Sequence, residues 1–237
     1  MRALLLAAGL GTRLQPLTDN IPKCLIEIDK KPLLEYWIAM LYKGGVSPLL
    51  VNIHHHADKV VNFIKNSPYT AFVTTVHEEK LFGTGGTLLK NRSFFDNEPN
   101  EPFLLVHADN LSIFDVKAFV NSHQNRPPGC EITMMTFKTP TPQTCGIVEI
   151  DEKGRVRAFH EKVANPPGNM ANGAVYIVEP SIFNYLKGLN KEFIDFSTGV
   201  IPYYMGRIYA FHNDVYHRDI GTIESYEMAC QEFPKIS

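Results

Sequence analysis

The sequence has few cysteines, almost no net charge and no long apolar run. Its four cysteines include no C-x-x-C pair, which argues against a disulfide framework and against a cysteine zinc site. The formal net charge of -2 gives no global attraction to nucleic acid or to an anionic membrane. No apolar run approaches the length of a bilayer span, and the opening RALLLAA is too short for a secretory signal. These absences predict a cytoplasmic protein with reduced thiols and no nucleic-acid or membrane partner.

The residues that are present suit a large α/β domain. The chain has 237 residues, of which 44% are hydrophobic, enough to build a substantial core. Through the first half, apolar runs alternate with segments of helical period, which predicts βαβ units and a mixed, mostly parallel central sheet with helices on both faces. The second half has short strands in close succession. We therefore expect one Rossmann-like domain over 1–237, with a nucleotide-binding half at about 1–125 and an acceptor-binding half at about 126–237.

A glycine-rich turn directly follows the first apolar run, in AAGLGTRLQPLTDNIPK. Gly9 and Gly11 match the first two glycines of the dinucleotide fingerprint, but Leu14 occupies the place of the third, and no Walker A Lys-Ser/Thr pair follows. The loop carries Arg13 instead, and Lys23 comes ten residues later. A guanidinium can bind two phosphate oxygens, and an ammonium can meet the charge that develops during phosphoryl transfer. This combination favours a triphosphate site over a surface turn with two solvated cations.

The stretch LLLAAGLGTRLQPLTDNIPKCLIEI closely resembles the signature of sugar-1-phosphate nucleotidyltransferases, and similarity continues in FGTGGTL, HADN, FHEK, NGAVYI and RDIGTIESY. The resemblance implies the nucleotide-diphospho-sugar transferase fold and the synthesis of a nucleotide sugar and pyrophosphate. It implies that Arg13 and Lys23 are catalytic residues that bind and activate a nucleoside triphosphate. We expect no β-helix extension. The family commonly forms dimers or tetramers, so a homo-oligomer is compatible with the sequence. Nucleotide-binding residues in the opening loop are expected to be Ala7, Ala8, Gly9, Gly11 and Thr12.

Two aspartates stand where strands are expected to end. Asp109 follows the apolar run PFLLVHA, and Asp219 ends VYHRD just before a helix. Mg²⁺ prefers oxygen ligands, often one or two carboxylates completed by phosphates and water. Asx-turn or capping roles are the alternatives, but Thr222 with Ser225 can cap the helix without Asp219. The resemblance implies that Asp109 and Asp219 hold the catalytic Mg²⁺.

A second glycine-rich stretch, HEEKLFGTGGTL, joins an expected strand to a helix. Gly83 and Gly85 allow a close backbone approach, and the corresponding loop of the family covers the base. Glu78 or Glu79 can accept two hydrogen bonds from the N–H edge of guanine, which uracil and thymine supply less well. This pattern favours GTP, although some uridylyltransferases have a similar loop.

The acceptor residues are expected in the second half. Glu161 and Lys162 are adjacent, so both reach one ligand only if their strand ends or bulges there. The resemblance implies that Glu161 binds sugar hydroxyls, that Lys162 binds the sugar phosphate, and that Asn172 and Gly173 contact the sugar. Gly199 stands where family members often carry an acidic residue.

That departure leaves the sugar open, with Asp195 as a candidate substitute for the missing acid. The stretch HEKV…PPGN…NGAVYI looks most like guanylyltransferases, so GTP with mannose 1-phosphate or a manno-heptose 1-phosphate is the favoured pair. A UTP-dependent sugar-1-phosphate uridylyltransferase is one alternative, and a cytidylyltransferase acting on a non-sugar phosphate acceptor is another. A catalytically silent regulatory subunit that binds a nucleotide sugar is a third, which the intact cations and aspartates disfavour.

Overall fold

The computed structural model describes residues 1–233 of the chain. The chain forms two compact units: 1–81 with 106–114 and the segment from Val215 make the first, and 82–105 with 115–214 make the second. The units are therefore not two consecutive halves of the sequence, because the C-terminal segment belongs with the N-terminal one. The organisation as one functional domain stays a prediction.

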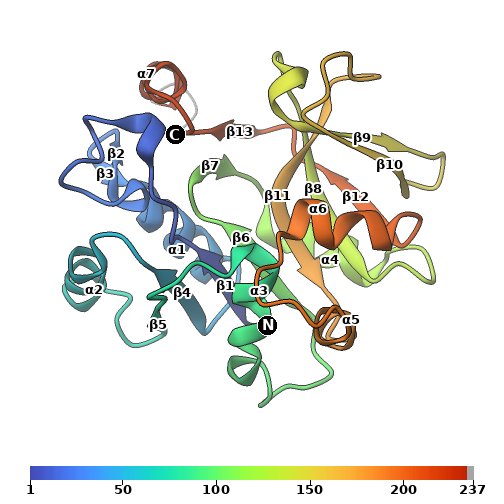
Figure 1. The fold of residues 1–237 in the computed structure, drawn as a ribbon, viewed down its shortest axis with the longest axis horizontal. Helices are drawn as coiled ribbons and strands as arrows, with labels where there is room; N and C mark the ends of the chain where they lie inside the picture. Colours follow the sequence, from blue (N-terminus) through green and yellow to red (C-terminus); the bar gives the residue numbers. More distant parts are fainter. Residues whose placement is uncertain (234–237) are drawn as a thin grey trace. The chain divides into compact units, whose positions relative to one another are not determined.

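The first unit is built on parallel strands. Strand β1 (Ala3–Leu6) pairs with β4 (Leu49–Ile53), and β4 pairs with β5 (Val73–His77). Every residue of β1 and β4 is buried, as expected for continuous apolar strands that are covered on both faces. Helix α1 (Leu33–Lys43) buries one apolar face, and α2 (Ala57–Lys65) lies beside β5 (Figure 1).

Two short ladders and a C-terminal helix complete the first unit. Strand β7 (Asn110–Ile113) pairs antiparallel with β13 (Tyr216–Asp219), and α7 (Ile223–Glu232) follows. Thr222 and Ser225 form the capping box at the start of α7, so the predicted cap is confirmed. The remaining short elements are β2 (Glu27–Ile28), β3 (Lys31–Pro32) and the 3₁₀ turns η1 (Thr12–Leu14) and η2 (Lys23–Leu25).

The second unit contains the closely spaced strands of the second half. Strand β11 (Met170–Val178) pairs antiparallel with β8 (Ile132–Lys138) and β9 (Gly146–Ile150), β9 pairs with β10 (Val156–Glu161), and β12 (Ile208–His212) runs parallel to β8. Its helices and 3₁₀ turns are α3 (Gly83–Lys90), η3 (Arg92–Phe94), α4 (Val116–Gln124), η4 (Pro142–Thr144), α5 (Ile182–Gly188), α6 (Phe196–Gly199) and η5 (Ile201–Tyr204). Along the chain, β6 (Phe103–His107) spans the boundary between the units. The predicted mixed, mostly parallel α/β sheet is confirmed.

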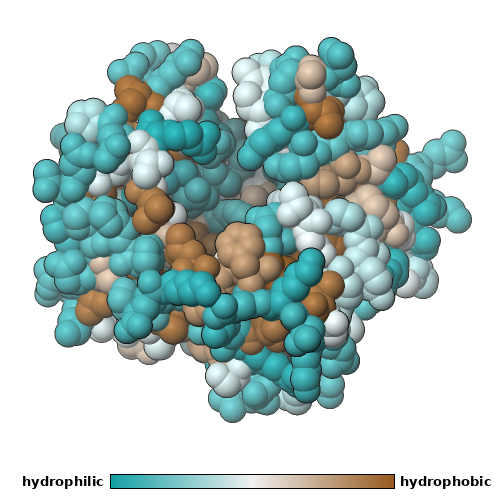
Figure 2. Space-filling view, viewed as in Figure 1, coloured by the Kyte–Doolittle hydropathy of each residue, from teal (hydrophilic) through white to brown (hydrophobic). Residues whose placement is uncertain are grey.

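The described surface is mainly hydrophilic on the face shown in Figure 2, where hydrophobic side chains occur in small groups. All four cysteines are free thiols. Among residues 1–233, no helix has the length and apolar character needed to cross a membrane. The cytoplasmic location and a homo-oligomeric assembly stay predictions.

Candidate active site

The opening loop of the first unit folds back on itself through Gly11. This glycine has a φ of 66°, and a Cβ atom there would lie 2.8 Å from Thr18 Cγ2 and 3.3 Å from Lys23 Cβ. The Thr18 hydroxyl donates a hydrogen bond of 2.8 Å to the Gly11 carbonyl. Any larger residue at Gly11 would therefore be strained and would displace Lys23.

Lys23 is buried and paired. Its side chain is 7% exposed, and Nζ lies 2.8 Å from Oδ2 of Asp109, which sits in the turn between β6 and β7. Burial opposes ionisation of Asp109, but the Lys23 ammonium and the His107 ring hold the pKa of its carboxyl below the usual value. The ion pair holds the Lys23 ammonium in one position. A positive charge that is already in position can stabilise negative charge on a phosphate without a rearrangement of the side chain.

The second aspartate reaches this place through the β7–β13 ladder. Asp219 is the register partner of Asn110, the residue that follows Asp109. A Cβ atom on Gly221 would lie 2.7 Å from Asp219 Oδ2 and 3.1 Å from Arg13 Nη2, so the carboxylate and the guanidinium both approach this glycine. The first unit therefore gathers both predicted cations and both predicted metal ligands. The sequence reasoning missed Gly221, although a glycine between a strand end and a helix cap was a visible signal.

Several buried groups hold the ladder in register. The Trp37 indole donates a hydrogen bond of 2.8 Å to the Asn110 carbonyl, and Ser112 Oγ lies 2.5 Å from His217 Nδ1. Burial lowers the pKa of His217 to about 3, against the opposing effect of Asp109, so this ring is neutral at pH 7. Sequence reasoning did not find these partners, because neither pair is close along the chain.

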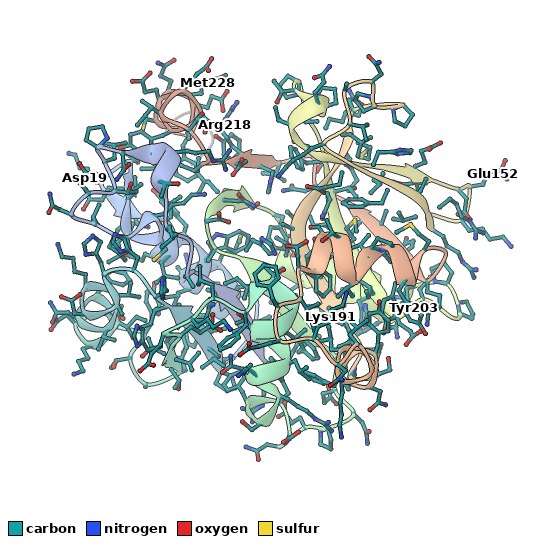
Figure 3. All side chains as sticks on the ribbon, viewed as in Figure 1. Asp19, Glu152, Lys191, Tyr203, Arg218 and Met228 are labelled. Atoms are coloured by element: carbon teal, nitrogen blue, oxygen red, sulfur yellow. The ribbon has the colours of Figure 1, made fainter. Side chains whose placement is uncertain are left out.

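Arg218 fastens the same strand to α7. Its guanidinium donates to both carboxylate oxygens of Glu232, at 2.8 and 2.6 Å, and the Tyr216 hydroxyl donates to the same carboxylate at 3.0 Å. Arg218 also lies close to Met228 of α7, as the labels in Figure 3 show. Strand β13, which carries Asp219, is thus held by its pairing with β7 and by these charged hydrogen bonds to α7.

The two aspartates fit a magnesium ion by their chemistry. Both supply hard carboxylate oxygens, and Asp219 is exposed while Asp109 is half-buried. Within the part of the chain that the structure describes, no three His, Cys, Asp or Glu side chains converge as a complete metal cage. Two carboxylates with the remaining positions filled by phosphate and water is the arrangement that Mg²⁺ commonly takes with nucleotides.

A buried carboxylate lies beside the opening strand. The Ala7 N–H donates to Asn52 Oδ1 at 2.7 Å, and Asn52 Nδ2 donates to Glu78 Oε2 at 3.3 Å. Glu78 is only 4% exposed, and its other oxygen, Oε1, is buried without a hydrogen-bond partner, whereas Glu79 is exposed. His54 Nδ1 lies 2.6 Å from the Glu78 carbonyl and fixes the backbone there. A buried acceptor without a donor is costly, which makes Glu78 Oε1 a candidate ligand contact.

The glycines of the second unit approach the protein's own backbone. Gly85 and Gly86 donate their N–H groups to the Ile194 carbonyl at 2.8 and 3.1 Å. A Cβ atom would lie 2.6 Å from Ile194 O at Gly83 and 2.8 Å from Glu192 O at Gly86. The close approach expected at Gly83 and Gly85 is therefore made by the 192–194 segment, and their contact with a base stays a prediction.

The expected acceptor pair lies at a strand end. Strand β10 ends at Glu161, and Lys162 adopts a left-handed conformation with a φ of 50°. Lys162 Nζ lies 3.5 Å from Glu161 Oε1, and Glu161 Oε2 would lie 2.7 Å from a Cβ atom on Gly146. The strand ending that lets both side chains reach one ligand is therefore present.

Asn172 and Gly173 lie in the same unit, where β11 bulges between Asn172 and Tyr176. Asp195 caps α6, because its Oδ1 accepts hydrogen bonds from the N–H and the hydroxyl of Thr198 at 2.9 and 3.0 Å. Gly199 accepts a hydrogen bond from the Tyr185 hydroxyl at its carbonyl. Asp195 is thus fixed in place at the start of α6.

A parallel α/β unit that brings two cations from 3₁₀ turns together with two aspartates from strand ends is the arrangement expected of a nucleotidyltransferase domain. The chain belongs to the nucleotidyl transferase family, whose model matches residues 2–235. The family predicted from the opening signature is confirmed.

The relatives indicate which branch of the family is similar. Mannose-1-phosphate guanylyltransferase 1 of Arabidopsis thaliana is 31% identical over 190 residues, which are 79% of this chain and 52% of the relative. Mannose-1-phosphate guanyltransferase beta-B of Xenopus laevis is 29% identical over 229 residues, 95% of this chain and 62% of the relative. The matches cover between 50% and 62% of the length of these curated relatives, less than two thirds of each.

Solved structures cover the chain almost completely. HddC from Yersinia pseudotuberculosis, complexed with GMP-PN, has a TM-score of 0.80 at 26% identity and covers 98% of this chain and 99% of its own. A putative glucose-1-phosphate thymidylyltransferase from Bacillus anthracis has a TM-score of 0.89 at 20% identity, covering 100% and 96%. The second similarity shows the fold alone.

Proposed function

We propose that the protein transfers a nucleotidyl group from a nucleoside triphosphate to a sugar 1-phosphate and releases pyrophosphate. The observation that carries this reaction class is the convergence of Arg13, Lys23, Asp109 and Asp219 within one unit. An oxygen of the acceptor phosphate forms a bond to the α-phosphorus, and the bond to the pyrophosphate oxygen breaks. Such a reaction needs positioned charge and no covalent nucleophile.

Each residue of this group has a distinct role. Arg13 binds oxygens of the triphosphate through its planar guanidinium, and Lys23 stabilises the charge that develops on the departing pyrophosphate. Asp109 and Asp219 would hold Mg²⁺, which would neutralise phosphate charge when bound. The Lys23 and Asp109 pair keeps the carboxylate ionised, as metal binding requires.

Guanine is the base that suits Glu78. A carboxylate with one oxygen anchored by Asn52 and the other buried without a partner can accept hydrogen bonds from the N1–H and N2–H₂ edge of guanine. Uracil and thymine have one N–H there, and adenine presents its donors differently. The similarity to mannose-1-phosphate guanylyltransferases supports the same choice.

The acceptor is a manno-configured sugar 1-phosphate, either mannose 1-phosphate or a manno-heptose 1-phosphate. Lys162 binds the sugar phosphate, Glu161 accepts hydrogen bonds from sugar hydroxyls, and Asn172 with Gly173 contacts the ring. The adjacency of Glu161 and Lys162 at the end of β10 supports this assignment.

The test is pyrophosphate release with Mg²⁺, using ATP, GTP, CTP, UTP and dTTP against mannose, manno-heptose, glucose and amino-sugar 1-phosphates and phosphocholine. We expect turnover with GTP and a manno-configured acceptor. Turnover with UTP or CTP would retain the reaction class and overturn the base assignment. Binding of a nucleotide sugar without turnover of any pair would indicate the regulatory alternative.

A matched pair of variants tests the base contact separately. Glu78→Gln exchanges one acceptor oxygen for a donor and should lower kcat/KM for GTP by about 10- to 100-fold, the effect of one or two hydrogen bonds to a charged group. Glu79→Gln changes the exposed neighbour and should leave kcat/KM for GTP within about twofold. Equal behaviour of the two variants would overturn the role of Glu78.

A further inference from the structure

Strand β11 changes direction at the residues assigned to the acceptor. Its register against β8 shifts between Asn172 and Tyr176, and Ala174 between them has a φ of 55°. A bulge of this kind redirects a side chain that a regular strand would place on the opposite face. The bulge therefore sets where the Asn172 carboxamide lies.

Both ends of that carboxamide are held by the bulge. The Ala174 N–H donates to Asn172 Oδ1 at 2.9 Å, and Asn172 Nδ2 donates to the Tyr176 hydroxyl at 2.7 Å. An asparagine side chain can donate two hydrogen bonds and accept two. One N–H and one lone pair of the half-buried Asn172 thus remain for another partner, with their directions fixed by the other two contacts.

Tyr176 is fully buried, and its ring packs on Phe196 of α6 with centroids 4.8 Å apart. Phenylalanine would fill this space without a hydroxyl that requires partners. Burial raises the pKa of Tyr176, opposed by its hydrogen bonds with Asn172 and Ser197, so the hydroxyl is protonated at neutral pH. The hydroxyl thus forms hydrogen bonds both with Asn172 of β11 and with Ser197 of α6.

Two carboxylates of the same unit act electrostatically on this hydroxyl. The negative charges of Glu161 and Asp195 both favour the protonated form of the Tyr176 hydroxyl and so help to raise its pKa. Glu161 ends β10, and Asp195 begins α6. Two hydroxyl-accepting carboxylates with an oriented amide are suited to a ligand that presents several neighbouring hydroxyl groups, such as a sugar.

We infer that Tyr176 is a positioning residue for the acceptor, because its hydroxyl orients the Asn172 carboxamide and ties it to the first turn of α6. This inference rests on the proposed function, in which Asn172 contacts the sugar. Tyr176 does not touch the acceptor, and it acts only through Asn172. Loss of the Tyr176 hydroxyl should weaken binding of the acceptor and leave nucleotide binding and the rate of the chemical step unchanged.

The test compares Tyr176→Phe with Tyr204→Phe, a second tyrosine buried in the same unit. For Tyr176→Phe we expect KM for the sugar 1-phosphate to rise about tenfold, the effect of one lost hydrogen bond, with KM for GTP and kcat within about twofold. Tyr204→Phe should leave all three constants within about twofold. Thermal unfolding of each variant is measured alongside, to check that the fold is retained.

A double-mutant cycle separates positioning from a general structural effect. Asn172→Ala should raise KM for the acceptor by at least as much as Tyr176→Phe, and adding Tyr176→Phe to Asn172→Ala should raise it no further. Additive effects, or an unchanged acceptor KM in Tyr176→Phe, would overturn the inference while the proposed function stands. A wild-type protein that turns over no sugar 1-phosphate would overturn the proposed function and this inference with it. Should Tyr176→Phe not fold, the same comparison is made with Ser197→Ala, which removes the partner that orients the hydroxyl and should raise acceptor KM at least threefold.

Discussion

Replacing Lys23 by methionine tests the centre of the candidate active site. The substitution keeps an unbranched side chain of similar length and removes the ammonium that lies 2.8 Å from Asp109. Because the Lys23 side chain is only 7% exposed, little water can reach this side of the Asp109 carboxylate and solvate it once the ammonium is gone. Asp109 would then be a half-buried carboxylate without its nearest cation.

The size of the effect follows from the burial of the two partners. Breaking a fully buried ion pair costs about 3–5 kcal/mol, and breaking an exposed pair costs about 0–1 kcal/mol. With Lys23 buried and Asp109 35% exposed, we expect the free energy of unfolding to fall by about 1–3 kcal/mol at pH 7. Loss of one preorganised charge in a transition state lowers kcat by about 100- to 1000-fold, so activity should fall far more than stability.

The stability loss should depend on pH with a definite sign. The pKa of Asp109 lies below its ordinary value of 3.8 in the folded protein, so the pair stabilises the fold above about pH 4. That stabilisation disappears as the pH falls through the lowered pKa. The difference between wild type and Lys23→Met should therefore be complete at pH 7 and shrink below about pH 4.

Urea unfolding at pH 7 and pH 3, together with pyrophosphate release at pH 7, measures both effects. Lys43→Met, at an exposed position near the end of α1, is the matched control and should change neither quantity. Near-normal turnover by Lys23→Met would refute the catalytic role. An equal stability loss at both pH values would refute the ion pair as its cause.

Three further predictions concern other parts of the molecule. Gly221→Ala places a Cβ atom 2.7 Å from Asp219 Oδ2 and should raise the Mg²⁺ concentration for half-maximal activity by about tenfold. Gly168→Ala, which has no atom within 4 Å of the new Cβ, is the control and should leave this concentration unchanged. An unchanged Mg²⁺ concentration for half-maximal activity in Gly221→Ala would contradict the proposed metal site. Gly86→Ala should lower the free energy of unfolding by about 1–3 kcal/mol because a backbone carbonyl lies 2.8 Å from the new Cβ, whereas Gly188→Ala meets no atom within 4 Å and should be neutral or stabilising. Similar urea midpoints for Gly86→Ala and Gly188→Ala would refute the close approach of the backbone carbonyl to Gly86. Burial, with a nearby arginine, lowers the pKa of His123 to about 3, so below about pH 6.5 the unfolded chain takes up this proton first, which contributes a loss of stability of about 1.4 kcal/mol per pH unit. His217, with a similarly lowered pKa, contributes a slope of its own, so His123→Gln should reduce the total slope by about 1.4 kcal/mol per pH unit without abolishing it, and an unchanged slope between pH 6.5 and 4 would contradict the prediction.

The sequence by itself determined the local elements and the chemical groups. Apolar runs such as ALLL and LLVNI became buried strands because only a two-sided hydrophobic environment accommodates them. The capping box at Thr222 and the strand end at Glu161 were also readable, since both depend on neighbouring residues. The cations and carboxylates of the site were named by the opening signature and by their positions at strand ends.

Tertiary structure alone decided which of these groups meet. Asp109 and Asp219 are far apart along the chain, and the unpredicted β7–β13 ladder brings them together. The anchoring of Glu78 by Asn52, and of Asn172 by Tyr176, likewise depends on register and on a bulge. Residue spacing reports periodicity along one segment, whereas pairing between segments is set by the packing of the whole unit.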